Sequence, residues 1–196
     1  MGPDLIQGQT PIEPEEYAGL KIKSITTQAE LNEFEQNNIE NALQWLMRKN
    51  IRPDVIFSEL FIREVHNRMF QDVWKWAGDF RTTNKNIGVD KHQIRTELKK
   101  LTDDIQHWTE NKSFSETETA IRFKHRLVKI HLFPNGNGRH SRIMADVVIT
   151  KYFGKQEVSW GNTNLYETGK ARSRYIEALK NADKGNYKAL IDFATG

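Results

Sequence analysis

The 196-residue sequence contains no cysteine. This absence excludes a disulfide-stabilised fold, a thiol nucleophile, and zinc or iron–sulfur centres with cysteine ligands. The sequence also has no apolar run of about 18 residues, so we expect no transmembrane helix and no membrane partner. The N-terminal residues lack the basic stretch and apolar run of a signal peptide, and we therefore expect a cytoplasmic location.

Acidic residues are absent from one window of the chain. Between Thr119 and Ala145 there is no Asp or Glu, although the chain contains 26 acidic residues. The window does contain six basic residues, namely Arg122, Lys124, Arg126, Lys129, Arg139 and Arg142. The remaining chain has 23 basic and 26 acidic residues, so the net charge of +3 arises in this window. Such a local excess indicates one anion site rather than a generally basic protein.

Helical periodicity dominates the sequence and predicts an all-α fold. Thr27 and Glu30 form a capping box, and the apolar residues after it predict a helix over residues 29–49, namely Leu31, Phe34, Ile39, Leu43 and Leu46. Further helices are expected after Pro53, around residues 94–108, from Ser115 to about 130, over 139–152, and near 164–182 and 186–194.

Two segments depart from this pattern. Residues 1–26 contain three of the five prolines and are expected to form an extended arm, which leaves 27–196 as a single domain. Residues 74–92 are rich in Gly, Thr and Asn without a helical period. We expect them to be irregular, with a short β-hairpin around Asn86–Gly88.

The segment that carries the most chemistry runs from His131 to Arg142. Gly136 and Gly138 allow the backbone to approach a ligand closely, and the helix that follows directs its N–H groups and its positive dipole end to the same point. Arg139 and Arg142 are three residues apart, so both can bond phosphate oxygens from one face of that helix. His131 precedes the loop as a candidate general base. These are the groups that phosphoryl or nucleotidyl transfer requires.

The joint pattern His-x-Phe-x-x-Gly-Asn-Gly-Arg-x-x-Arg resembles the signature of the Fic (Fido) family. The stretch Trp76-Ala-Gly-Asp-Phe-Arg81 is similar to the segment that leads into the flap of these proteins, and Arg174–Leu179 is similar to a C-terminal helix of the family. The resemblance covers roughly residues 30–193 and is strongest to the bacterial subgroup called mobile mystery protein B. It implies a Fic-like helical bundle with a short β-hairpin flap. Independently of the resemblance, we expect Phe133 to be a core anchor rather than a ligand contact.

The resemblance also implies an activity, the transfer of AMP from ATP to a Ser, Thr or Tyr hydroxyl of a protein target. His131 would be the base, and Gly136, Asn137 and Gly138 would form the anion hole. Arg139 and Arg142 would hold the β- and γ-phosphates. The flap, with Thr82, Thr83, Ile87, Gly88 and Val89, would align the target by strand addition.

Asn135 departs from the family pattern, which usually has Asp or Glu as the Mg²⁺ ligand at this position. An amide oxygen can face Mg²⁺ but brings no charge, and hard divalent cations favour carboxylates. Slow AMP transfer, a different phosphate-bearing donor, and nucleotide binding without turnover are therefore three open outcomes.

Glu40 and Asn41 partly match the inhibitory-helix pattern Ser/Thr-x-x-x-Glu-Gly/Asn of many Fic proteins, with Gln36 at the Ser/Thr position. This match implies that Glu40 pairs with Arg142 and displaces the γ-phosphate. The alternative is that Glu40 is one of several acids on a solvated helix face.

The sequence is thus compatible with three kinds of protein: a nucleotidyl transferase, a nucleotide-binding regulatory module and a nucleic-acid binder. The basic window alternates with apolar residues and lacks the interleaved aromatics of single-strand binders, so nucleic acid is the least favoured partner. The expected partners are ATP and a protein target of unknown identity, and the sequence leaves homo-oligomerisation open.

Overall fold

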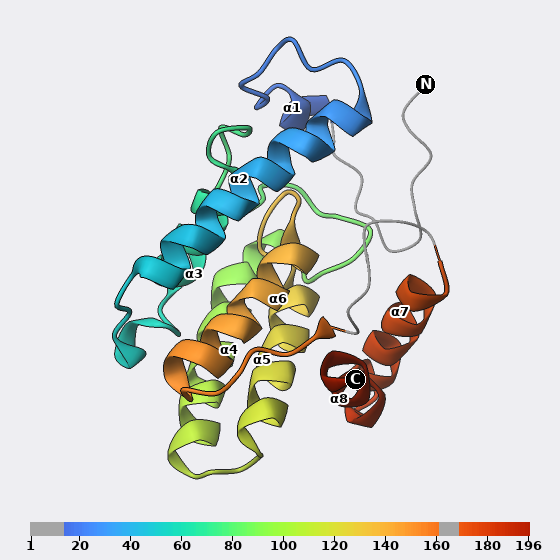
Figure 1. The fold of residues 1–196 in the computed structure, drawn as a ribbon. Coiled ribbons are helices and arrows are strands. Elements are labelled where there is room, and N and C mark those ends of the chain that lie inside the picture. The colour runs from blue at the N-terminus through green and yellow to red at the C-terminus, as the bar shows by residue number, and fades with distance from the viewer. Residues whose placement is uncertain (1–13, 161–168) are drawn as a thin grey trace.

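The computed structural model describes residues 14–160 and 169–196. Within these ranges the chain is all-α (Figure 1), with α1 (Pro14–Tyr17), α2 (Gln28–Arg48), α3 (Glu59–Phe70), α4 (Ile94–Glu110), α5 (Glu116–Ile130), α6 (Asn137–Val147), α7 (Lys170–Asp183) and α8 (Lys188–Thr195). Short 3₁₀ turns cover Pro53–Val55 and Lys91–Gln93, and a π-helical turn, Val148–Tyr152, extends α6. Among the described residues, no helix combines the length and apolarity needed to cross a bilayer.

Local capping explains where several helices begin. Thr27 accepts from the backbone N–H of Glu30, whose carboxylate in turn accepts from the backbone N–H of Thr27, so the predicted capping box is present. Ser115 likewise accepts from the N–H of Glu118 at the start of α5. The predicted helix over 29–49 is confirmed as α2. The first residues of the helix expected near 164–182 lie outside the described residues, and α7 begins at Lys170.

The α5–α6 pair forms the centre of the bundle. Helix α4 packs on α5, α3 packs on α6, and α2 packs on α3 at the periphery. Helices α7 and α8 pair with each other and contact α5 through α8, which gives a second, smaller apolar cluster (Figure 1). This arrangement places α3 against the loop between α5 and α6, and α2 near the first turn of α6.

Helix α2 buries a different stripe from the expected one. Leu31, Ile39 and Leu46 are buried as predicted, but Phe34 and Leu43 are exposed. Glu35 lies on the buried stripe instead, four residues after Leu31 and four before Ile39. An acidic side chain in this position requires a partner from another helix.

Candidate active site

The loop between α5 and α6 is held by its own side chains. Phe133 is fully buried, which confirms it as a core anchor. The Asn137 amide clamps it, accepting from the Phe133 N–H at 3.0 Å and donating to the Phe133 carbonyl at 2.8 Å. Gly136 has a positive φ of 77°, and a Cβ there would lie 2.5 Å from the Phe70 ring. The loop therefore requires glycine at position 136 and asparagine at position 137.

His66 on α3 packs against this loop, and the sequence pattern had assigned it no role. Its ring stacks on Phe133 with centroids 3.6 Å apart. Its Nδ1 accepts from the Gly78 N–H at 3.0 Å, so Nε2 carries the proton and donates to the Asn135 carbonyl at 3.1 Å. Complete burial lowers the pKa of His66 well below its usual range, which keeps this tautomer neutral.

Helix α6 begins at Asn137, and Gly136, its N-cap, has no side chain with which to cap the helix. Because the Asn137 amide is engaged with Phe133, it does not cap the helix, and the backbone N–H groups of the first turn can face an anion. A Cβ added at Gly138 would meet nothing within 4 Å, so the first turn borders open space. This geometry is that of a phosphate-binding helix N-terminus.

His131 ends α5 in the left-handed conformation and is 4% exposed. In the tautomer that donates from Nδ1 to the Val128 carbonyl (3.4 Å), Nε2 is the basic nitrogen. Burial lowers the pKa of His131 to about 4, and the charges of Arg81 and Lys85 act in the same direction. The imidazole is therefore neutral near pH 7, in the state that a general base requires.

The two motif arginines extend toward different helices. Arg139 donates to the Glu35 carboxylate on α2 at 2.6 Å, and its guanidinium lies over the Phe70 ring at 4.8 Å. Glu35 also accepts from the Trp74 indole at 2.7 Å. Arg142 lies beside Tyr175 on α7, with its guanidinium carbon 5.8 Å from the ring centroid.

Tyr175 contacts a second basic side chain, Lys124, in addition to Arg142. The buried Lys124 ammonium donates to its hydroxyl, and Arg142 also hydrogen-bonds to it. Burial acts to raise the pKa of Tyr175, but the charges of Lys124 and Arg142 outweigh burial and hold that pKa below its usual value. The position of Arg142 is thus set by α7 rather than by an acidic partner on α2.

The predicted contact between Glu40 and Arg142 is absent. Glu40 lies on the exposed side of α2, where its carboxylate accepts from the Gln36 amide at 3.1 Å. It is five residues from Glu35, which is well over one helical turn and places the two acids on different faces. The acid that reaches the motif is Glu35, and the arginine that it reaches is Arg139.

The expected β-hairpin flap is also wrong. In the described structure, residues 82–89 consist of turns and bends without a strand. The Arg81 guanidinium donates to the carbonyls of His131 (2.6 Å), Thr83 (2.7 Å) and Val89. Because Arg81 occupies carbonyls at both ends of the segment, these groups are not available for cross-strand pairing.

The flap segment nevertheless lies against the candidate base. The Val89 N–H donates to the Ile130 carbonyl at 3.3 Å. Gly88 has a φ of 100°, and a Cβ there would lie 2.6 Å from the His131 Cβ. Thr82 and Ile87 are exposed at the surface of this segment.

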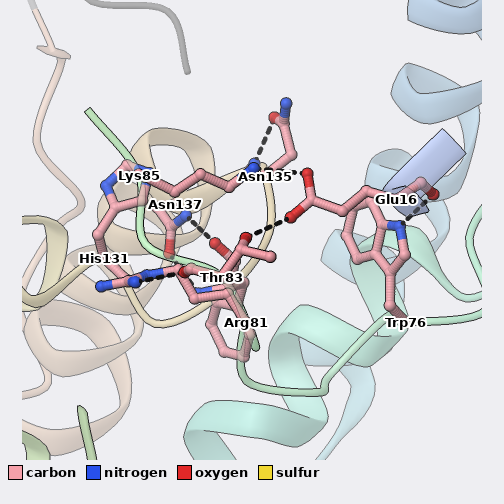
Figure 2. A network of polar contacts seen from close by, with 10 residues as sticks. Glu16, Trp76, Arg81, Thr83, Lys85, His131, Asn135 and Asn137 are labelled. Atoms are coloured by element: carbon pink, nitrogen blue, oxygen red, sulfur yellow. Dashed lines mark hydrogen bonds and ion pairs between the residues drawn. The ribbon is translucent and has the colours of Figure 1, made fainter. Parts of the chain in front are cut away.

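Figure 2 shows a polar network that connects the flap to the loop and to α1. The Lys85 side chain is fully buried and forms an ion pair with Glu16 on α1 at 2.5 Å. In this view Lys85 also extends toward Asn135. The sequence analysis missed Glu16, Glu35 and Lys85 because each reaches the motif from a distant segment.

This donor set does not fit Mg²⁺. Asn135 is neutral, and its Oδ1 accepts from the Gly136 N–H at 2.5 Å. The charged groups of the adjoining network are the Lys85 ammonium and the Glu16 carboxylate, and this acid is already paired with the ammonium, which itself would repel a divalent cation. Within 14–160 and 169–196, no group of three or more His, Asp or Glu side chains could hold a metal.

The remaining charges of the basic window do not form a free basic surface. The pairs are Arg122 with Glu118 (2.8 Å), Arg126 with Asp104, and Lys129 with Asp183 (3.1 Å). Lys124 is buried against Tyr175. Carboxylates from neighbouring segments thus neutralise the part of the window that lies outside the motif, which removes the main argument for nucleic-acid binding.

Comparison with known proteins gives relatives of one kind. Residues 56–149 match the Fic/DOC family. Protein adenylyltransferase Fic of Drosophila grimshawi is 26% identical over 136 residues, 67% of this chain but 26% of that protein, so the chain spans about a quarter of the length of this relative. Probable protein adenylyltransferase y4lH of Sinorhizobium fredii is 25% identical over 176 residues, 85% of this chain and 84% of that protein.

Solved structures agree on the fold. The BepC protein of Bartonella tribocorum with bound AMPPNP superposes with a TM-score of 0.68 at 20% identity, over 96% of this chain and 92% of that one. Fic-1 (residues 134–508) of C. elegans gives a TM-score of 0.66 at 22% identity, over 87% of this chain and 49% of that one. The predicted Fic-like helical bundle is therefore confirmed, while the subgroup stays a prediction. Residues 56–149, which carry the His131–Arg142 motif, are thus the part of the chain that matches the Fic/DOC family.

Proposed function

We propose that this protein transfers AMP from ATP to a Ser, Thr or Tyr hydroxyl of a protein target. The observation that carries the proposal is that a neutral His131 lies at the end of α5, one short loop before the α6 N-terminus and its two arginines. The relatives in Drosophila and Sinorhizobium are named as adenylyltransferases, and BepC was solved with AMPPNP, which support ATP as the donor.

The proposed step is a single displacement at the α-phosphorus. His131 Nε2 takes the proton of the target hydroxyl, whose oxygen attacks the α-phosphorus. The bond from that phosphorus to the bridging oxygen of the β-phosphate breaks, and pyrophosphate leaves. The α6 N–H groups, Arg139 and Arg142 stabilise the charge on the phosphates.

The target would lie along residues 82–89, beside His131. Ile87 is 44% exposed there and offers an apolar contact for a target segment. The phosphates of a bound nucleotide would also raise the pKa of His131 from its low value toward neutrality, because nearby negative charge favours the imidazolium. His131 would therefore become a stronger base once the nucleotide is in place.

Glu35 restrains this activity in our proposal, in the role that the sequence assigned to Glu40. Its carboxylate occupies the Arg139 guanidinium that a phosphate would need. The same contact favours the second candidate function, a regulatory module that holds a nucleotide without turning it over.

Mass spectrometry of the purified protein and of a host lysate after incubation with ATP tests the proposal. We expect a hydroxyl side chain to gain the mass of AMP, and His131→Ala to reduce labelling by about 10²–10⁴-fold, the usual contribution of a general base. Calorimetric ATP binding without any labelled protein would support the regulatory module instead, and the absence of both would refute the two proposals together.

A further inference from the structure

Lys85 is a buried ammonium group in an otherwise exposed loop. Its side chain has no exposed surface, although its neighbours Asn84 and Asn86 are exposed. Removing an ammonium group from water costs several kcal/mol unless charged partners compensate. A lysine in a loop can usually turn its long side chain into solvent, so this burial needs a physical reason.

The ammonium is held in place from the side of α1. Glu16 binds it at 2.5 Å and also accepts from the Thr83 hydroxyl at 3.3 Å. The Trp76 indole donates to the Glu16 carbonyl at 3.1 Å, which fixes the backbone of that acid. The three Arg81 hydrogen bonds fix the loop that carries Lys85. The network therefore positions a charge, as Figure 2 shows.

That charge lies beside the loop between α5 and α6. In Figure 2 the Lys85 side chain runs between Glu16 and Asn135. Its charge also acts on His131, so the ammonium lies within electrostatic range of the candidate base. A carboxylate at position 135 would add a second acid beside the ammonium, whereas the neutral Asn135 amide leaves the ammonium paired with the single carboxylate of Glu16.

We propose that Lys85 provides the positive charge that the nucleotide phosphates need at Asn135, in place of a divalent cation, so that this protein binds ATP without Mg²⁺. The inference rests on the proposed function, because it concerns the same nucleotide site. An ammonium carries three donors, so it can keep its contact with Glu16 and donate to a phosphate oxygen as well. Glu16 is a positioning residue in this arrangement.

Isothermal titration of ATP in excess Mg²⁺ and in EDTA tests the proposal on the full chain. The wild type should bind in both buffers with dissociation constants that agree within about threefold, and Lys85→Met should weaken binding about tenfold or more in both. Lys85→Arg, which keeps the charge, should retain most of the affinity. Lys99→Met, which removes an exposed lysine paired with Asp103 on α4, is the matched control and should behave as the wild type.

A second pair of variants tests the exchange between the lysine and the metal. Asn135→Asp alone should pair with Lys85 and show no Mg²⁺ dependence. Lys85→Met with Asn135→Asp should bind ATP in Mg²⁺ at least about tenfold more tightly than in EDTA, because a carboxylate without the ammonium can ligate the cation. If thermal melting shows that Lys85→Met is unfolded, Lys85→Met with Glu16→Gln removes both charges and serves in its place.

The outcomes separate the two proposals. ATP binding that requires Mg²⁺ in the wild type, or that is unchanged or tighter in Lys85→Met, overturns the role of Lys85 and leaves the proposed function intact. A wild type that binds ATP in neither buffer overturns the proposed function and this inference with it.

Discussion

The ion pair between Glu35 and Arg139 is the contact that most directly opposes phosphate binding. The Glu35 side chain is 5% exposed and that of Arg139 is 17% exposed, and the two groups meet at 2.6 Å. The other Glu35 oxygen accepts from the Trp74 indole at 2.7 Å. Both stability and nucleotide affinity should therefore respond to the loss of this one carboxylate.

Glu35→Gln removes the charge and keeps the volume and an oxygen for the Trp74 indole. Removing one partner of a buried pair costs about 3–5 kcal/mol, and we expect a smaller loss of about 2–3 kcal/mol, because the amide oxygen still accepts a hydrogen bond and Arg139 touches solvent. In the variant, Arg139 is available to a phosphate. A charge-assisted hydrogen bond contributes about 1.5–3 kcal/mol, so ATP affinity should rise about 10- to 100-fold.

Urea unfolding and ATP calorimetry measure the two effects on the same variant. Glu40→Gln is the matched control, because it makes the same chemical change on the exposed face of α2 and should alter neither quantity. Stability that falls without any gain in ATP affinity would show that Glu35 is only structural. A gain in Glu40→Gln instead would mean that α2 presents a different face to the nucleotide, and the reasoning from this structure would be refuted.

Two further predictions concern acid and the phosphate loop. Burial lowers the pKa of His131 and of His140 to about 4, below the usual value of 6.5, so the stability that each neutral histidine provides is complete above about pH 6.5 and is lost as the pH falls toward 4. The urea-unfolding free energy should therefore drop by roughly 2 kcal/mol per histidine between about pH 7.5 and about pH 5, and a flat profile would contradict this assignment. Gly136→Ala should lower the free energy of unfolding by about 2–5 kcal/mol in the same assay, because alanine is strained at a positive φ and its Cβ would meet the Phe70 ring. The Cβ of Gly138→Ala would meet nothing within 4 Å, so this variant should unfold as the wild type does and change only ATP affinity. Equal stability losses in the two glycine variants would refute the distinction.

The sequence was sufficient wherever the structure depends on neighbours along the chain. Caps such as Thr27 and Ser115 act within one helical turn, so they locate helix starts without tertiary information. The Gly136–Arg142 segment is equally local, since a helix start and its first turn are set by adjacent residues. These local features predicted the fold class and the candidate phosphate site.

The partner of a charged side chain depends on which face of its helix it lies on, and the predicted contact between Glu40 and Arg142 is absent for this reason. A linear pattern pointed to Glu40, but Glu35 follows Leu31 and precedes Ile39 at four-residue spacing on the buried stripe. An acid in register with the apolar positions of a helix is a signal that the sequence did contain. What it could not give is the identity of the partner, because Arg139 meets Glu35 only once α2 has packed on α3 and α3 on α6.

At Asn135, the sequence motif alone does not give the charge of the site, because charged side chains from distant segments also contribute to it. From the sequence alone, Asn135 stands where the family pattern has an acid, and the sequence therefore predicts weak metal binding. The structure adds Lys85 from the flap and Glu16 from α1, so the loop borders a positioned ion pair in place of a carboxylate with a bound cation. An acid restored at position 135 alone would add a second carboxylate beside this ammonium and would weaken the attraction that the ammonium offers to the phosphates. The effect of the residue at position 135 therefore depends on Lys85, and these two residues come together only when the flap has folded onto the loop.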